Sequence, residues 1–124
     1  MDTKQLKELL LHVQQGTVSL DDAEAKLKRL PFEDLGFARV DHHRALRQGM
    51  GEVIFGQGKT PQQVVDIFSA LRAHGHPVLA TRVADEAVAA VLERHPDAVH
   101  HELARCITYS DGPVEVTHEG KVLV

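Results

Sequence analysis

Apolar residues near the start of the chain recur with the period of an amphipathic helix. Four of them stand at i, i+3, i+4 and i+7 and therefore share one face: Leu6, Leu9, Leu10 and Val13. Gly16 interrupts this helix, and a second one begins at Ser19, where Ser-Leu-Asp-Asp is typical of a capping box, and ends before Pro31. The residues expected on its buried face are Leu20, Ala23 and Leu27. The pattern predicts a helical hairpin over residues 1–30.

After this hairpin the period changes to that of a β-strand. Apolar and polar residues alternate over residues 37–41, which predicts a half-buried strand. The residues expected on its buried face are Ala38 and Val40. One turn of helix is expected over residues 43–48, closed by Gly49, and a short strand over residues 53–55.

The clearest helix start in the sequence is at Thr60. Thr60 suits an N-cap, Pro61 the first helical position and Gln63 the reciprocal position of a capping box. The residues expected to be buried along this helix are Val64, Val65, Ile67, Phe68 and Leu71. A buried strand over residues 77–80 and a helix over residues 84–94 follow. The order strand, helix, strand, helix predicts a small parallel βαβ core.

The end of the chain is expected to form β structure. Residues 99–108 are strand-like, residues 110–113 indicate a turn, and alternation resumes at residues 114–116. Lys121-Val-Leu-Val begins an apolar strand, and an uncovered strand of this kind invites aggregation. We therefore expect a further domain beyond it. The alternative is a true C-terminal strand that completes the sheet.

The predicted fold class is α+β or α/β, with a helical hairpin, a small mixed sheet containing βαβ units, and a C-terminal β-hairpin. The expected organisation is an arm over residues 1–30, a small α/β domain over 31–119, and the first strand of a missing domain over 120–124.

Composition excludes several classes of protein. The 124 residues carry a net charge of −4, which argues against a nucleic-acid binder with a basic stripe. The one cysteine, Cys106, allows no internal disulfide. The start of the chain has no apolar signal core, and no apolar run is long enough to span a bilayer. We therefore expect a cytoplasmic protein with no membrane partner.

The densest polar segment lies between residues 39 and 47. Arg44 and Arg47 are three residues apart, so on a helical turn they project from the same side and offer parallel donors to a phosphate or carboxylate. Asp41 suits the orientation of an arginine or the binding of ribose hydroxyls. The alternative is a solvated face with internal salt bridges.

Three other residues are candidates for binding an anion. Gly56-Gln-Gly-Lys-Thr is not a P-loop, because Val53 stands where the pattern needs glycine. Lys59 nevertheless stands at the start of a predicted helix, where an anion is favoured. Thr81 and Arg82 follow a predicted strand at the edge where open α/β sheets bind ligands. A simple loop is the alternative for these two residues.

Nine histidines raise the possibility of a metal site. None of the pairs has the i, i+4 spacing of a zinc-binding helix, and the chain has no cysteine pair. Adjacent histidines on a strand point to opposite faces, so each doublet offers at most one ligand. A site would have to combine three separate segments. We therefore predict no metal site, and a small metal-handling protein is the alternative.

Two stretches, Asp34-Leu-Gly-Phe-Ala-Arg-Val-Asp-His-His-Arg-Ala-Leu-Arg-Gln-Gly and Glu52-Val-Ile-Phe-Gly-Gln-Gly-Lys-Thr-Pro, resemble the N-terminal domain of the LarB family. Val78-Leu-Ala-Thr-Arg-Val fits the same family. LarB starts the synthesis of the nickel-pincer nucleotide cofactor. The final Lys121-Val-Leu-Val resembles the first strand of the family's C-terminal domain, which is similar to aminoimidazole ribonucleotide carboxylase. Met50-Gly51 departs from the family pattern, which usually has an aromatic residue and then proline.

The resemblance implies a reaction. LarB carboxylates nicotinic acid adenine dinucleotide with carbon dioxide or bicarbonate and hydrolyses its phosphoanhydride, which gives AMP and a pyridinium biscarboxylate mononucleotide. The catalytic groups belong to the carboxylase-like domain, so this chain is expected to lack turnover alone, to hold no tightly bound cofactor, and to belong to a homo-oligomer when full-length. By match to the motif, the residues expected to bind substrate are Asp41, His42, Arg44 and Arg47, then Lys59, Thr81 and Arg82. The alternative is a non-catalytic oligomerisation module.

Overall fold

The computed structural model describes residues 3–28, 32–48, 51–113 and 119–121. Within these ranges, nothing is described of the side chains of Lys28, Leu46 and Arg47. None of the helices in this part of the chain is long and apolar enough to cross a membrane.

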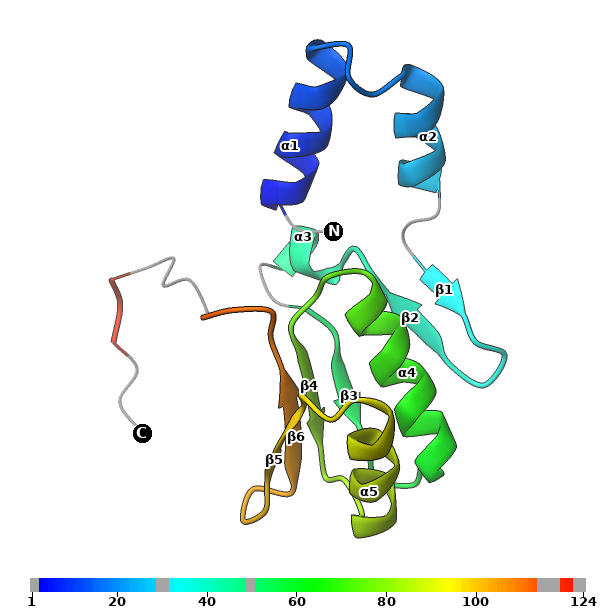
Figure 1. Cartoon of the computed structure of the whole chain (residues 1–124), viewed down its shortest axis with the longest axis vertical. Helices are drawn as coiled ribbons and strands as arrows, with labels where there is room; N and C mark the ends of the chain where they lie inside the picture. The colour runs from blue at the N-terminus through cyan, green and yellow to red at the C-terminus, as the bar shows by residue number, and fades with distance from the viewer. Residues whose placement is uncertain (1–2, 29–31, 49–50, 114–118, 122–124) are drawn as a thin grey trace.

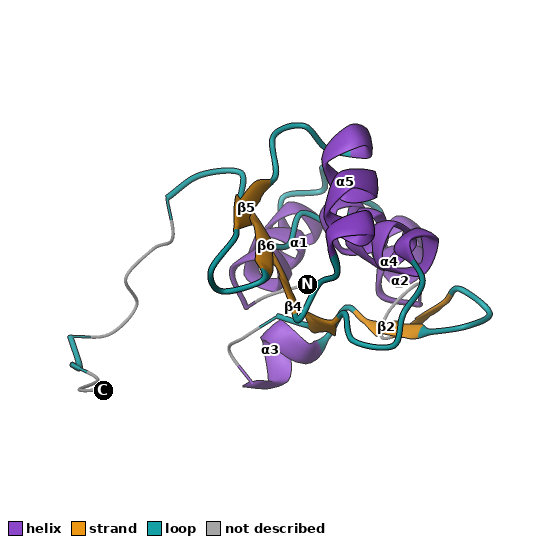
Figure 2. Cartoon of the chain, turned by 90° about the horizontal axis from the view of Figure 1, so that it is seen from below, coloured by secondary structure: helices purple, strands orange, loops and turns teal. Residues whose placement is uncertain are grey.

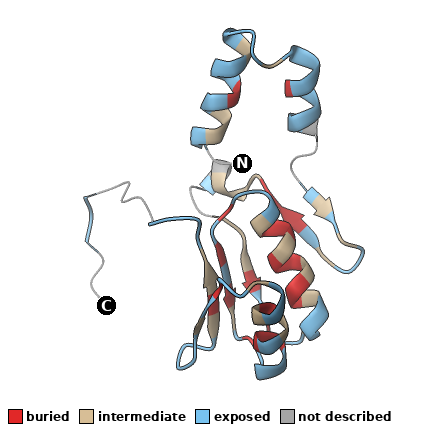
Figure 3. Ribbon diagram, in the orientation of Figure 1, coloured by how far each residue is buried: buried red, intermediate tan, exposed pale blue. Residues whose placement is uncertain are grey.

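The N-terminal hairpin consists of α1 (Thr3–Gln14) and α2 (Leu20–Lys28), as predicted. Gly16 turns the chain at φ +73°, and the hydroxyl of Ser19 accepts the amide of Asp22 at 3.1 Å. The predicted burial was mostly wrong. Leu9 and Ala23 are buried, whereas Leu20 is 75% exposed and Leu27 37% exposed. The two helices lie beyond the end of the sheet and are mostly exposed, because they pack chiefly against each other (Figures 1 and 3).

A two-stranded hairpin follows, formed by β1 (Phe32–Asp34) and β2 (Arg39–Asp41). Only β2 was predicted, because Phe-Glu-Asp has no apolar alternation of its own. Val40 is buried, as predicted, but so is Asp41, which was expected on the exposed face with Arg39. The predicted helical turn is α3 (Arg44–Gln48), and its expected closing residue, Gly49, lies outside the described residues.

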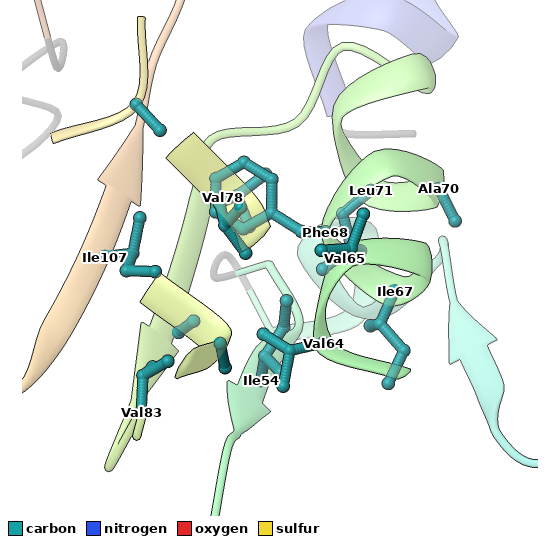
Figure 4. Close-up of a cluster of buried hydrophobic side chains, with 14 of the residues drawn as sticks. Ile54, Val64, Val65, Ile67, Phe68, Ala70, Leu71, Val78, Val83 and Ile107 are labelled. Carbon is teal, nitrogen blue, oxygen red and sulfur yellow. The ribbon is translucent and has the colours of Figure 1, made fainter. Parts of the chain in front are cut away.

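The predicted parallel βαβ unit is present. β3 (Val53–Phe55) and β4 (Val78–Thr81) are parallel neighbours joined by α4 (Pro61–Ala73). Thr60 and Gln63 form the full capping box at the start of α4. The buried residues of α4 include all five that were predicted: Val64, Val65, Ile67, Phe68 and Leu71. In Figure 4 they surround the same core as Ile54, Val78 and Ile107.

Helix α5 (Asp85–Arg94) packs beside α4 on the same face of the sheet (Figures 1 and 2). The strand order is β3-β4-β6-β5, with β5 (Val99–His101) and β6 (Cys106–Tyr109) forming an antiparallel hairpin. The prediction of one continuous strand over residues 99–108 was wrong, because the chain turns at residues 102–105. Arg105 takes a φ of +52° there, and its carbonyl accepts the amide of Val83 at 3.0 Å.

The β5–β6 hairpin is not the predicted C-terminal hairpin, which was expected to turn at residues 110–113 and to pair residues 99–108 with residues 114–116. The alternation expected at residues 114–116 lies outside the described residues. The same holds for residues 122–124 of the expected final strand.

Gly56 lies where β3 approaches the loop after β4, and we predict that Gly56→Ala destabilises the fold. A Cβ at Gly56 would stand 2.9 Å from the Thr81 carbonyl oxygen and 3.1 Å from that of Arg82. Both atoms belong to the backbone, so the strands must separate, at a cost of about 1–3 kcal/mol. Urea denaturation measures this cost. Gly112→Ala, where a Cβ meets nothing within 4 Å, is the control and should be near neutral.

Candidate functional site

The fold places the predicted binding residues at opposite ends of the parallel pair. Because β3 and β4 run in the same direction, the residues that follow them share one edge, where Lys59, Thr81 and Arg82 lie. The segment that contains Asp41 and Arg44 precedes β3 and lies at the other end. The Arg44 Nη1 atom is 3.7 Å from the Glu52 Oε1 atom, just before β3 begins. The predicted residues therefore form two separate groups.

At the carboxyl edge, the cationic groups are held by β3 and its loop. Lys59 Nζ donates to the Phe55 carbonyl at 2.8 Å. The Arg82 Nη1 atom donates to Gln57 Oε1 at 3.3 Å, and its guanidinium lies 5.5 Å from the centre of the Phe55 ring. The Thr81 hydroxyl donates weakly, at 3.4 Å, to a carbonyl of β3. All three side chains thus contact β3 or the loop that follows it, and the cations of Lys59 and Arg82 lie at this edge.

At the amino edge, burial divides the predicted residues by role. Asp41 is 8% exposed, and its Oδ1 atom accepts the amide of His43 at 3.0 Å. His42 is 1% exposed, and its Nε2 atom lies 2.8 Å from Glu33 Oε2. Arg44 is partly exposed, and the side chain of Arg47 is not described. Among the described residues of this group, Arg44 is therefore the one best placed to meet a ligand.

A histidine cluster surrounds His42. Its ring stacks on the ring of His74, with centroids 3.5 Å apart and 22° between the planes, and the ring of His76 is 5.9 Å away. Glu33 Oε2 lies 3.8 Å from His74 Nδ1. Burial is the main cause that lowers the pKa of His42, and its hydrogen bond to Glu33 opposes that effect. The sequence analysis did not identify Glu33 and His74, because no local pattern links β1 to the end of α4.

A groove of about 600 Å³ crosses the face of the sheet that α4 and α5 leave open. Strand register places four of its residues in one row across the sheet: Val53, Leu79, Thr108 and Val99. Most of the lining is apolar, and Glu52 lies at one end. The volume is within the usual range of small-molecule sites. Arg44 lies behind Glu52, 3.7 Å from its carboxylate, and does not itself line the groove.

A second polar cluster resembles a Ser-His-Asp triad but cannot work as one. Arg72 donates to both carboxylate oxygens of Asp97 at 2.6 Å, and its Nη1 lies 3.1 Å from His95 Nδ1. That nitrogen must therefore accept, so His95 Nε2 donates to the Ser69 hydroxyl at 2.7 Å. Ser69 in turn donates to Val65. Since His95 cannot take the serine proton, the cluster ties α4 to the segment after α5.

Comparison with known proteins decides the family. The profile described as "LarB/PurE-like N-terminal domain" matches residues 32–111. The chain belongs to this family. Over 83 residues it is 31% identical to "Uncharacterized protein MJ0165" of Methanocaldococcus jannaschii. The aligned region covers 66% of this chain and 32% of that protein. The chain thus matches about a third of the length of this relative.

Membership relates the chain to the LarB and PurE carboxylases and confirms the predicted resemblance. The matched region begins at β1 and contains both groups of predicted binding residues, the histidine cluster and the groove. The hairpin of α1 and α2 lies outside the matched region. Of the two residues that depart from the family pattern, Gly51 lines the groove and Met50 is not among the described residues.

We predict that the domain over residues 32–111 loses stability in mild acid, because His95 becomes protonated when the chain unfolds. Burial, followed by the charge of Arg72, lowers the pKa of His95, so the unfolded chain takes up a proton more readily. The free energy of unfolding should therefore fall as pH drops below the ordinary value of 6.5 toward the lower folded pKa. Denaturation across this range in the wild type and His95→Gln tests the effect. An equal slope in both proteins would contradict it.

Proposed function

We propose that this chain is the N-terminal part of a LarB-like enzyme that carboxylates nicotinic acid adenine dinucleotide and hydrolyses its phosphoanhydride. Its own contribution would be to help bind the dinucleotide. The observation that carries the proposal is the family match over residues 32–111, which contains the groove, Glu52 at its end and Arg44 behind Glu52. The products would be AMP and a pyridinium biscarboxylate mononucleotide.

The geometry around Arg44 supports the binding of an anion. Its 3.7 Å approach to Glu52 exceeds a normal hydrogen bond, so the pair is loose. The Nε atom of Arg44 is buried and has no hydrogen-bond partner among the described residues. A buried donor without a partner costs free energy, whereas the exposed part of the guanidinium can donate to a phosphate or carboxylate oxygen. The apolar row beside it suits a flat ring system.

The described chain offers no evident nucleophile for the reaction. The one cysteine, Cys106, is half-buried in β6, and its thiol contacts the Ala104 carbonyl at 3.1 Å. Ser69 donates to a backbone carbonyl and lies beside a histidine that cannot accept its proton. In the proposed division of labour, this part binds substrate and the carboxylase-like domain carries out the chemistry.

The proposal predicts that Arg44→Ala lowers the activity of the full-length protein toward the dinucleotide. The protein encoded by the full reading frame is assayed for AMP release from nicotinic acid adenine dinucleotide and for incorporation of labelled bicarbonate. Loss of a charged hydrogen bond to substrate should lower kcat/KM about 10-fold or more. Lys7→Ala, on exposed α1, is the matched control and should have no effect.

Two further variants separate the two predicted groups. Lys59→Ala and Arg82→Ala remove cations at the carboxyl edge. If these variants lose activity while Arg44→Ala keeps it, the substrate-binding site lies at the carboxyl edge. A full-length protein that neither binds nor converts the dinucleotide would refute the proposed function.

Oligomerisation is a second candidate function, favoured by the exposed leucines of the hairpin. The large apolar residues exposed there are Leu10, Leu11, Leu20 and Leu27. Exposed leucines on both helices suit a helix-to-helix contact between copies.

If the hairpin joins copies, Leu10→Glu combined with Leu20→Glu should lower the mass measured by light scattering, because two charges would be placed in the contact. Leu103→Glu is the control, since Leu103 is a fully exposed leucine in the β5–β6 turn. An unchanged mass in the double variant would exclude the hairpin contact.

A further inference from the structure

Three segments that are distant in sequence bring Glu33, His42 and His74 together at the end of α4. One donor atom from each lies within 4.8 Å of the other two. We propose that these three side chains bind one divalent transition-metal ion of the zinc class. His42 was also predicted to bind substrate, but its buried ring lies against Glu33 and His74, so zinc binding can be tested separately from the proposed dinucleotide function.

The backbone explains why the three side chains meet. Glu33 pairs with Val40 across the β1–β2 hairpin, so His42, two residues further along, lies diagonally opposite on the same face. His74 is the C-cap of α4, and its ring stacks on His42. The hairpin and the helix end thus present their polar groups to one point.

The distances suit a small ion. Zinc binds nitrogen and oxygen at about 2.0–2.2 Å, which places tetrahedral ligand atoms about 3.3 Å apart. Glu33 Oε2 lies 2.8 Å from His42 Nε2 and 3.8 Å from His74 Nδ1, so the two separations fall on either side of that value. The three donor atoms all lie within 4.8 Å of one another, so a ring movement is needed to bring them all to binding distance.

The donor set selects the kind of metal. Two imidazoles and one carboxylate favour zinc and its neighbours, and they resemble the His-His-Glu sets of zinc enzymes. Calcium and magnesium prefer oxygen ligands alone, which argues against them. The described cluster contains no thiolate, so a soft monovalent ion is not favoured.

Exposure fits a metal site, whereas one backbone contact of His74 would have to be given up. The His42 side chain is fully buried, whereas Glu33 and His74 are 36% and 35% exposed and leave a route for an ion. His74 Nδ1 lies 2.9 Å from the Ala70 carbonyl oxygen. A carbonyl oxygen only accepts, so this nitrogen donates its proton there, and His74 must give up that contact before Nδ1 can bind a metal.

The stacked rings add a requirement. With only 22° between their planes, the lone pairs of His42 and His74 run nearly side by side and do not converge. Metal binding therefore requires rotation of one ring, and His74 can rotate because it is partly exposed. Zinc should accordingly shift the NMR signals of both rings, which a proton-sharing cluster without metal affinity would not show.

The test measures zinc binding by the whole chain, without a polyhistidine tag, near neutral pH. Equilibrium dialysis should show one equivalent of retained zinc, and zinc should raise the melting temperature because it binds the folded state. Glu33→Gln and His74→Gln should each weaken the affinity about 10-fold or more and reduce the thermal shift. His101→Gln, on exposed β5, is the matched control and should bind as the wild type does.

Three outcomes would overturn the proposal: no stoichiometric zinc, undiminished affinity in both Glu33→Gln and His74→Gln, or an equal loss in His101→Gln. Glu33→Gln keeps the shape of the side chain, so the test stands even if His74→Gln fails to fold. Because zinc is measured directly, a negative result leaves the dinucleotide proposal untouched, and the reverse also holds.

Discussion

The parallel pairing of β3 with β4 is the constraint on which the rest of this structure depends. Parallel neighbours need a crossover, and α4 provides it with a capped start and a buried face over the strands. Each large apolar side chain buried there contributes about 1.5–3 kcal/mol. The close approach at Gly56 allows the turn from β3 to reach the loop after β4. The direction of the two strands then decides which polar groups can meet.

Sequence reasoning succeeded where local chemistry determines the structure. α4 was predictable because Thr60, Pro61 and Gln63 favour a helix start and the apolar residues continue with its period. β1 was missed because Phe-Glu-Asp forms a strand only by pairing with β2. The β5–β6 turn was missed because Arg105 takes a positive φ that its type does not signal. The exposure of Leu20 depends on what covers α2, which periodicity does not describe.

The candidate site shows the same division between local and tertiary information. The polar run from residue 39 to residue 47 was visible as a segment, but its division into buried Asp41 and His42 and partly exposed Arg44 was not. Glu33, His42 and His74 also lie together in the folded chain. No spacing rule could join these three, because the helix end and the hairpin meet only in the folded chain.

The proposed anion site and the histidine cluster are close in the chain, because one residue separates His42 from Arg44. Asp41 accepts the amide of His43 and holds this turn, so the position of the His42 ring and the start of α3 are set together. Any interaction that fixes His42 against Glu33 and His74 therefore also restricts the backbone position of Arg44. Arg44 in turn lies behind Glu52, which lines the groove. The cluster around the buried His42 therefore helps to fix the turn from which Arg44 starts.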